Sequence, residues 1–144
     1  IPKSASTSLM ATLGKYQKID SIQEFEKLKE CNIPDDLNIL HQFHSDIREI
    51  NKEHVNYFKN DNVFYKQHIF PSKNNLELLK KTKKVVLLRP PVEILYSYKR
   101  GIDKGISILK YDYKKNMDKT EWIEKSKQIG LYSDLSLFYK NIYV

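Results

Sequence analysis

The strongest constraint on the fold is a run of four apolar residues, 85–88 (VVLL), that lies between Lys84 and Arg89. The run is apolar at every position and does not alternate with polar residues, which is typical of a parallel strand buried on both faces. Pro90 and Pro91 follow at once, and proline is tolerated in the first turn of a helix. The segment therefore predicts a buried strand over 84–89 that leads into a helix.

The rest of the chain predicts helices around a second short strand. Residues 63–68 (VFYKQH) are rich in β-branched and aromatic side chains and predict that strand. Ser21, with Glu24 three residues later, matches a capping box and predicts a helix to about residue 31. Apolar residues at helical spacing predict the other helices, which cover about residues 9–13, 46–59, 73–79, 91–99, 120–128 and 133–143.

This order of elements predicts an α/β fold, with a short parallel sheet flanked by helices. The 144 residues suit a single domain, 1–144, since one domain usually has about 100–200 residues. No stretch approaches the roughly 18–20 apolar residues of a membrane span, and the first residues have no signal-peptide pattern. The single cysteine, Cys31, excludes an internal disulfide framework and a cysteine-based zinc cluster, so we expect a reducing, cytoplasmic compartment.

The charge balance favours anionic partners. There are 25 basic and 18 acidic residues, which give a net charge of +7. All but three of the basic residues are lysines, and this richness has a second explanation, since Lys, Asn and Ile all have A/T-rich codons. The three arginines, Arg48, Arg89 and Arg100, are therefore the more informative cations, because arginine binds phosphate through two parallel hydrogen bonds.

Three segments carry residues suited to an anionic ligand. Residues 2–9 (PKSASTSL) place Lys3 and several small hydroxyl residues before a predicted helix, whose N-terminal N–H groups and dipole favour anions. Arg89 ends the predicted strand, at the sheet edge where ligands of open α/β folds bind, and Ser97 lies two helical turns later. His68 ends the other strand at the same edge and is a candidate general base.

Each segment also has a purely structural explanation. Serine and threonine are expected at an ordinary helix cap, and residues 2–9 lack the glycines of the nucleotide-kinase phosphate loop. A single histidine at the end of a strand is more often solvated than catalytic. His41 and His44 are spaced as a metal pair, but we find no cysteine or carboxylate to complete that site and expect no metal.

Together the three segments resemble the sulfotransferases that use 3′-phosphoadenosine 5′-phosphosulfate, and are most similar to the glycan O-sulfotransferases. Residues 2–9 resemble the family's 5′-phosphosulfate-binding loop. Residues 85–98, with Arg89 and Ser97 eight positions apart, resemble its 3′-phosphate-binding strand and helix. His68 occupies the position of the family's catalytic histidine. The resemblance covers roughly residues 1–100 and implies a P-loop-like sulfotransferase fold.

The resemblance implies transfer of a sulfuryl group to an acceptor hydroxyl or amine, with a carbohydrate as the expected acceptor. His68 would take the acceptor's proton, and Lys3 would neutralise charge on the bridging oxygen as the 3′,5′-bisphosphate leaves. The mechanism requires no metal. Arg89 and Ser97 would bind the 3′-phosphate. The residues implied for the 5′-phosphosulfate are Lys3, Ser4, Ala5, Ser6, Thr7 and Ser8.

The sequence departs from the family pattern in several places. Ala5 stands where many members have glycine, and Pro90 follows the arginine in place of an acidic residue or asparagine. The strand before the loop is reduced to Ile1-Pro2, and the basic segment that covers the nucleotide near the C-terminus has no counterpart, so we expect a shortened form of the fold. An unpaired sheet edge would favour a homo-oligomer.

Two other functions remain open. One is a nucleotide or small-molecule kinase of related fold, and the other is a non-catalytic module that binds polyanions. We expect the acceptor substrate as the main partner, and neither nucleic acid nor a membrane.

Overall fold

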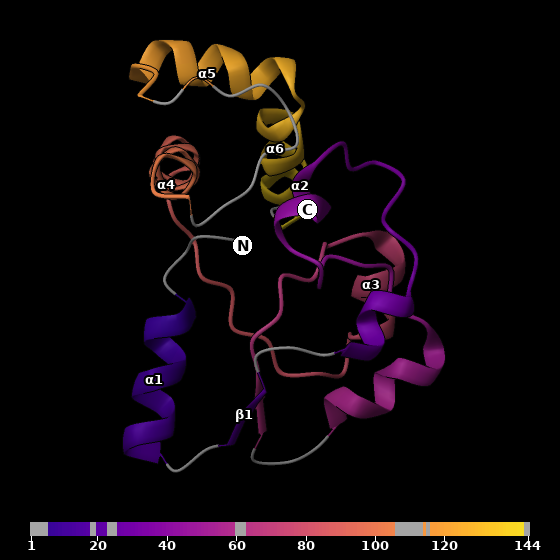
Figure 1. The fold of residues 1–144 in the computed structure, drawn as a ribbon. Helices are drawn as coiled ribbons and strands as arrows, with labels where there is room; N and C mark the ends of the chain where they lie inside the picture. The colour runs from indigo at the N-terminus through magenta and orange to yellow at the C-terminus, as the bar shows by residue number, and fades with distance from the viewer. Residues whose placement is uncertain are drawn as a thin grey trace.

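The computed structural model describes residues 6–17, 20–22, 26–59, 63–105, 114 and 116–142. Figure 1 shows α4, α5 and α6 gathered at one end of the molecule, with α1 and β1 at the other. The described chain is therefore mostly helical, with a small sheet. In chain order its elements are α1 (Ser6–Gln17), β1 (Asp20–Ile22), the 3-10 helix η1 (Glu26–Glu30), α2 (Leu40–Phe43), the 3-10 helix η2 (Lys52–Lys59), β2 (Val63–Tyr65), α3 (Lys73–Leu78), α4 (Pro91–Asp103), α5 (Lys119–Gln128) and α6 (Leu131–Ile142).

The sheet formed by the described residues pairs β1 with β2 in parallel. The strand predicted from Val63 is confirmed, although it ends at Tyr65 rather than at His68. A mixed fold of helices with a short parallel strand pair is thus present. The wider sulfotransferase-like sheet stays a prediction.

The helix predicted from a Ser21 cap is wrong. Ser21 lies inside β1, opposite Phe64 of β2. The next element of the described residues is the short 3-10 helix η1, Glu26–Glu30. Pairing with β2 is a long-range contact, and it overrides the local capping pattern on which the prediction depended.

Residues 84–89 do not form the buried strand that their apolar run predicts. They belong to no strand of the described structure, and the exposed fractions of Val85, Val86 and Leu88 are 67%, 49% and 49%. An apolar run is buried only where a partner strand and covering helices are present, and β1 and β2 pair with each other instead. The helix after the run is confirmed as α4, which has proline in its first turn.

The main core lies among α2, α4, α5 and α6. Trp122 of α5 is fully buried, and its indole N–H donates to the carbonyl of Leu95 on α4 at 2.7 Å. Phe138 of α6 meets Phe70 edge to face, with ring centroids 5.1 Å apart. A second cluster joins η1, η2 and α3, and its buried members are Leu28, Cys31, Ile50, Phe58 and Leu79.

Asp134 of α6 ties the C-terminal helix to the start of α2. Its Oδ2 accepts hydrogen bonds from the backbone N–H groups of Ile39 and Leu40, at 2.8 and 2.7 Å. Its Oδ1 accepts from the backbone and side-chain amides of Asn38, both at 2.8 Å. The carboxylate is fully buried, so hydrogen bonds to these donors replace the hydrogen bonds that it would make to water. The contact fixes α2 and thereby the turn that follows it.

We expect Asp134→Ala to lower the free energy of unfolding by about 2–6 kcal/mol, because the buried backbone N–H groups of Ile39 and Leu40 lose their acceptor and each costs about 1–3 kcal/mol. Urea denaturation measures the loss. The control is Asp35→Ala in an exposed turn, which should change the free energy of unfolding by no more than about 0.5 kcal/mol. Equal effects of the two substitutions would contradict the anchoring role of Asp134.

Candidate functional site

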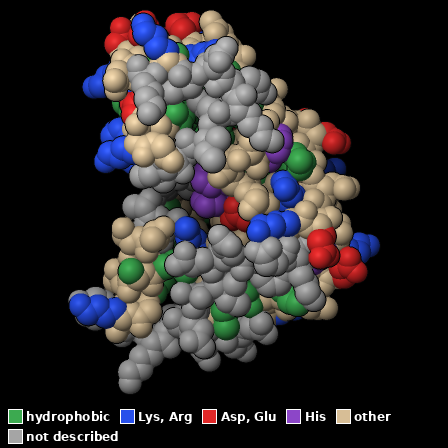
Figure 2. Space-filling model, viewed as in Figure 1, with side chains coloured by type: hydrophobic (Ala, Val, Ile, Leu, Met, Phe, Trp, Pro, Cys, Tyr) green, Lys and Arg blue, Asp and Glu red, His purple; other side chains and the backbone are tan. Residues whose placement is uncertain are grey.

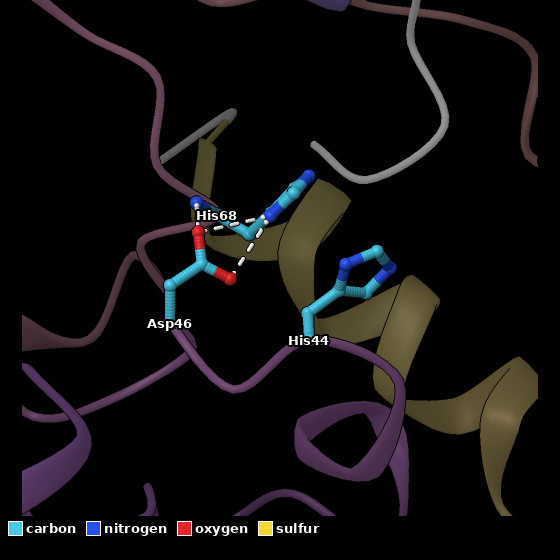
Figure 3. Close-up of side chains that lie close together, drawn as sticks. All are labelled: His44, Asp46 and His68. Carbon is cyan, nitrogen blue, oxygen red and sulfur yellow. Dashed lines mark hydrogen bonds and ion pairs between the residues drawn. The ribbon is translucent and has the colours of Figure 1, made fainter. Parts of the chain in front are cut away.

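His68 and Asp46 form a close hydrogen-bonded pair between two loops (Figure 3). Nδ1 of His68 lies 3.0 Å from both carboxylate oxygens of Asp46, and the backbone N–H of His68 donates to Oδ2 at 2.8 Å. The side chains of His68 and Asp46 are 13% and 16% exposed. A carboxylate at Nδ1 favours a proton on that nitrogen, which leaves Nε2 as the ring nitrogen able to accept another proton.

His44 stands beside this pair. Its ring centroid is 4.2 Å from that of His68, and the ring planes meet at 42°. Its Nε2 lies 2.6 Å from the hydroxyl of Tyr98 on α4. Figure 3 shows the opposite edge of the His44 ring turned toward His68 and Asp46. Tyr98 therefore joins the histidine cluster to α4, the helix expected to bind the 3′-phosphate.

Asn75 of α3 braces the two loops that carry the hydrogen-bonded pair. Its Nδ2 donates to the carbonyls of Arg48 and Phe70, both at 2.9 Å, and its Oδ1 accepts from the backbone N–H of Ile50 at 2.8 Å. Arg48 and Ile50 belong to the loop of Asp46, and Phe70 lies two residues after His68. The buried amide thus holds the loops at a fixed separation.

The surroundings shift the pKa values of two acids in the cluster. Burial by itself would raise the pKa of Asp46, but the hydrogen bonds and charge of His68 outweigh it and hold that pKa below its usual value. Burial raises the pKa of Tyr98 well above its usual range, and the charges of Asp46 and Asp134 add to the effect. At neutral pH Asp46 is therefore a carboxylate, and Tyr98 keeps its O–H.

The cluster is partly open to solvent. Figure 2 shows histidine side chains near the middle of one face, with an acidic side chain and basic side chains beside them. The 13% exposure of the His68 side chain agrees with this view. A partly shielded imidazole that solvent can still reach suits a reaction in which a proton is taken from a bound acceptor.

The predicted phosphosulfate segment lies partly outside the described residues, since Lys3, Ser4 and Ala5 are not described. The helix predicted after it is confirmed as α1, but α1 begins at Ser6. Thr7 and Ser8 therefore stand in the exposed first turn of α1 rather than in the expected loop. An anion site at this helix start stays a prediction.

Arg89 and Ser97 lie at the beginning and in the middle of the α4 segment. Nε of Arg89 is 2.9 Å from Oε2 of Glu93, and the Arg89 carbonyl accepts a hydrogen bond from the hydroxyl of Tyr139. Arg89 precedes α4, which begins at Pro91, whereas Glu93 and Ser97 lie four residues apart near one side of the helix. The contact that joins α4 to the cluster is made by Tyr98, the residue after Ser97.

The partners of His68 are not predicted by the sequence. Asp46 is 22 residues away, and no motif links the two positions. The available signal was local, because His44 and Asp46 put an imidazole and a carboxylate two positions apart. The statement that no carboxylate completes a site at His44 is therefore wrong, since Asp46 and His68 lie beside it.

Comparisons with protein-family models, with curated proteins and with solved structures return no match to this chain. Among the helices of the described residues, none has the length and apolar character that crossing a membrane requires. The function is therefore inferred from the chemistry of the cluster.

We expect Asn75→Ala to lower the free energy of unfolding by about 2–4 kcal/mol, because the Ile50 N–H and two carbonyls lose their partner. Hydrogen exchange of the Ile50 amide should become at least about 10-fold faster. The control is Lys73→Ala, an exposed residue of the same helix, which should leave this amide protected. Unchanged exchange in Asn75→Ala would show that Asn75 does not brace the loop.

Proposed function

We propose that this chain transfers a sulfuryl group from 3′-phosphoadenosine 5′-phosphosulfate to a hydroxyl or amine of an acceptor, with a carbohydrate as the expected acceptor class. The observation that carries the proposal is the Asp46 carboxylate at Nδ1 of His68. It supports the role of general base that the family resemblance gives to His68. A base held in this way has a fixed ring and a fixed tautomer before the substrate arrives.

In the proposed reaction the acceptor oxygen or nitrogen attacks the sulfur atom of the donor. Its proton passes to Nε2 of His68, and the imidazolium that forms is stabilised by the Asp46 carboxylate. The bond between sulfur and the bridging oxygen breaks, and 3′-phosphoadenosine 5′-phosphate leaves. Lys3, as the resemblance implies, would balance the charge that develops on the bridging oxygen.

The proposed nucleotide contacts involve Arg89, just before α4, Ser97 within α4, and the segment that leads into α1. Arg89 and Ser97 would bind the 3′-phosphate, and the segment from Lys3 to Ser8 would bind the 5′-phosphosulfate. Arg89 forms its ion pair with Glu93 at a site where the two side chains are 34% and 52% exposed. Because this pair is partly solvated, a phosphate with two negative charges can displace Glu93 at small cost.

The cofactor separates this function from the alternatives. A kinase of related fold would use the same base with ATP as donor, and a polyanion-binding module would need no base. In a thermal-shift assay, 3′-phosphoadenosine 5′-phosphate should raise Tm and ATP should not. Stabilisation by ATP alone would favour the kinase, and stabilisation by heparin alone would favour the polyanion module.

We expect His68→Asn to lower the transfer rate by about 10²- to 10⁴-fold, the usual contribution of a positioned base. Bisphosphate binding, measured by calorimetry, should change little because the proposed nucleotide contacts are untouched. The control is His54→Asn, a buried histidine that lies 3.5 Å from Sγ of Cys31, outside the Asp46–His68 pair. Transfer that survives in His68→Asn, or that is lost equally in the folded control, would remove His68 from the mechanism.

We expect Arg89→Ala to weaken binding of 3′-phosphoadenosine 5′-phosphate by roughly 10- to 100-fold, because it removes a charge-assisted hydrogen bond worth about 1.5–3 kcal/mol. Adenosine 5′-phosphate, which lacks the 3′-phosphate, should lose almost nothing. The control is Arg100→Ala, an exposed arginine inside α4, the helix that follows Arg89. Equal losses for both nucleotides would mean that Arg89 has only a structural role.

A further inference from the structure

We propose that His44, Asp46 and His68 form a binding site for one divalent transition-metal ion of the zinc class. Each of the three residues offers one ligand atom, and these atoms all lie within 4.8 Å of one another. The inference stands on this geometry and does not depend on the proposed sulfuryl transfer.

The kinds of ligand select the kind of ion. Two imidazoles and a carboxylate suit Zn²⁺, Cu²⁺, Ni²⁺ or Fe²⁺, whereas Ca²⁺ and Mg²⁺ prefer sites made of oxygen atoms. Three protein ligands leave a position open for water, as in zinc sites that are not closed by a fourth side chain. All three residues are only partly buried, so an ion from solution can reach them.

The distances require little rearrangement. Zinc binds imidazole nitrogen and carboxylate oxygen at about 2.0–2.2 Å, so ligand atoms around one ion lie about 3.3–3.5 Å apart. Asp46 and His68 are already closer than this, at 3.0 Å, because they are hydrogen-bonded to each other. The ligand atoms of the three residues lie within 4.8 Å of one another, so the His44 ring has to move by no more than about 1.5 Å.

Tyr98 holds His44 in the orientation that such a site needs. The Tyr98 hydroxyl contacts Nε2, so the Nδ1 edge of the ring faces His68 and Asp46 (Figure 3). With an ion on Nδ1, the proton of the His44 ring sits on Nε2 and is donated to the hydroxyl oxygen of Tyr98. Partners of this kind orient metal-binding histidines and strengthen the binding.

A bound ion has a defined consequence for the proposed reaction. An ion on His68 and Asp46 removes the carboxylate from its role at the imidazole, so His68 no longer serves as the base. The ion is therefore expected to inhibit transfer. Metal binding is measured without an activity assay, so a chain that binds no ion is distinguishable from a chain that transfers no sulfuryl group.

The test is a titration of the tag-free chain with Co²⁺, followed by its visible d–d absorption, and with Zn²⁺, followed by calorimetry. We expect one ion per chain, with no thiolate-to-cobalt charge-transfer band in the near ultraviolet. The absence of this band would show that the ion is not bound by the buried pair of Cys31 and His54, whose Sγ and Nδ1 are 3.5 Å apart. A strong thiolate band, or no saturable binding to the wild-type chain, would overturn the proposal.

Variants locate the ion. Asp46→Asn and His44→Gln each remove a ligand and should weaken binding by more than about 100-fold, whereas Tyr98→Phe should weaken it by about 10- to 100-fold. Tyr98→Phe keeps the buried ring and changes the packing least, so it serves if a ligand variant does not fold. Asp35→Asn is the charge-matched control and should bind as the wild type does. Wild-type affinity in folded Asp46→Asn and His44→Gln would refute the site.

Discussion

The buried carboxylate of Asp134 joins parts of the chain that are 94 to 96 positions apart, and the position of the candidate site follows from it. It accepts hydrogen bonds from three consecutive backbone N–H groups at the start of α2. His44 and Asp46 follow that short helix. Asn75 then braces the loop after Asp46 against the loop after His68. Two buried polar side chains, each fully hydrogen-bonded, thereby fix loops that have no regular secondary structure of their own.

The elements that the sequence predicts correctly are those with local signals. Pro91 marks the start of α4, and the apolar spacing of the last third gives α5 and α6. The hydroxyl of Ser72 accepts from the backbone N–H of Asn75, as expected for the cap of α3. Local patterns predict these helices because their hydrogen bonds join residues only a few positions apart.

The errors arise where a long-range contact decides the outcome. Ser21 pairs in a strand with Phe64 despite its capping pattern, and Val85 is exposed despite its apolar neighbours. In the site, His68 could be predicted from its place after a short strand. Asp46 could not, because its contact with His68 spans 22 residues and leaves no trace in either local pattern. The Tyr98–His44 contact spans 54 residues and is hidden for the same reason.

The Asp46–His68 pair supports two kinds of chemistry, and the position of one proton separates them. A proton on Nδ1 of His68, held by Asp46, leaves Nε2 to act as a base. A metal ion takes the place of that proton between the same two side chains. In both cases Tyr98 sets the orientation of His44, so α4 is coupled to the cluster whether the ligand is a proton or an ion.

The most direct test of this account is the tautomer of His68, read from long-range ¹H–¹⁵N correlation spectra of the metal-free, ¹⁵N-labelled chain at a pH where the ring is neutral. The account predicts that Nδ1 carries the proton and that Nε2 is unprotonated, because Nδ1 lies 3.0 Å from both oxygens of Asp46. The proton should move to Nε2, or exchange between the nitrogens, in Asp46→Ala. A wild-type spectrum with the proton on Nε2 would contradict the Asp46–His68 hydrogen bond on which the site is built.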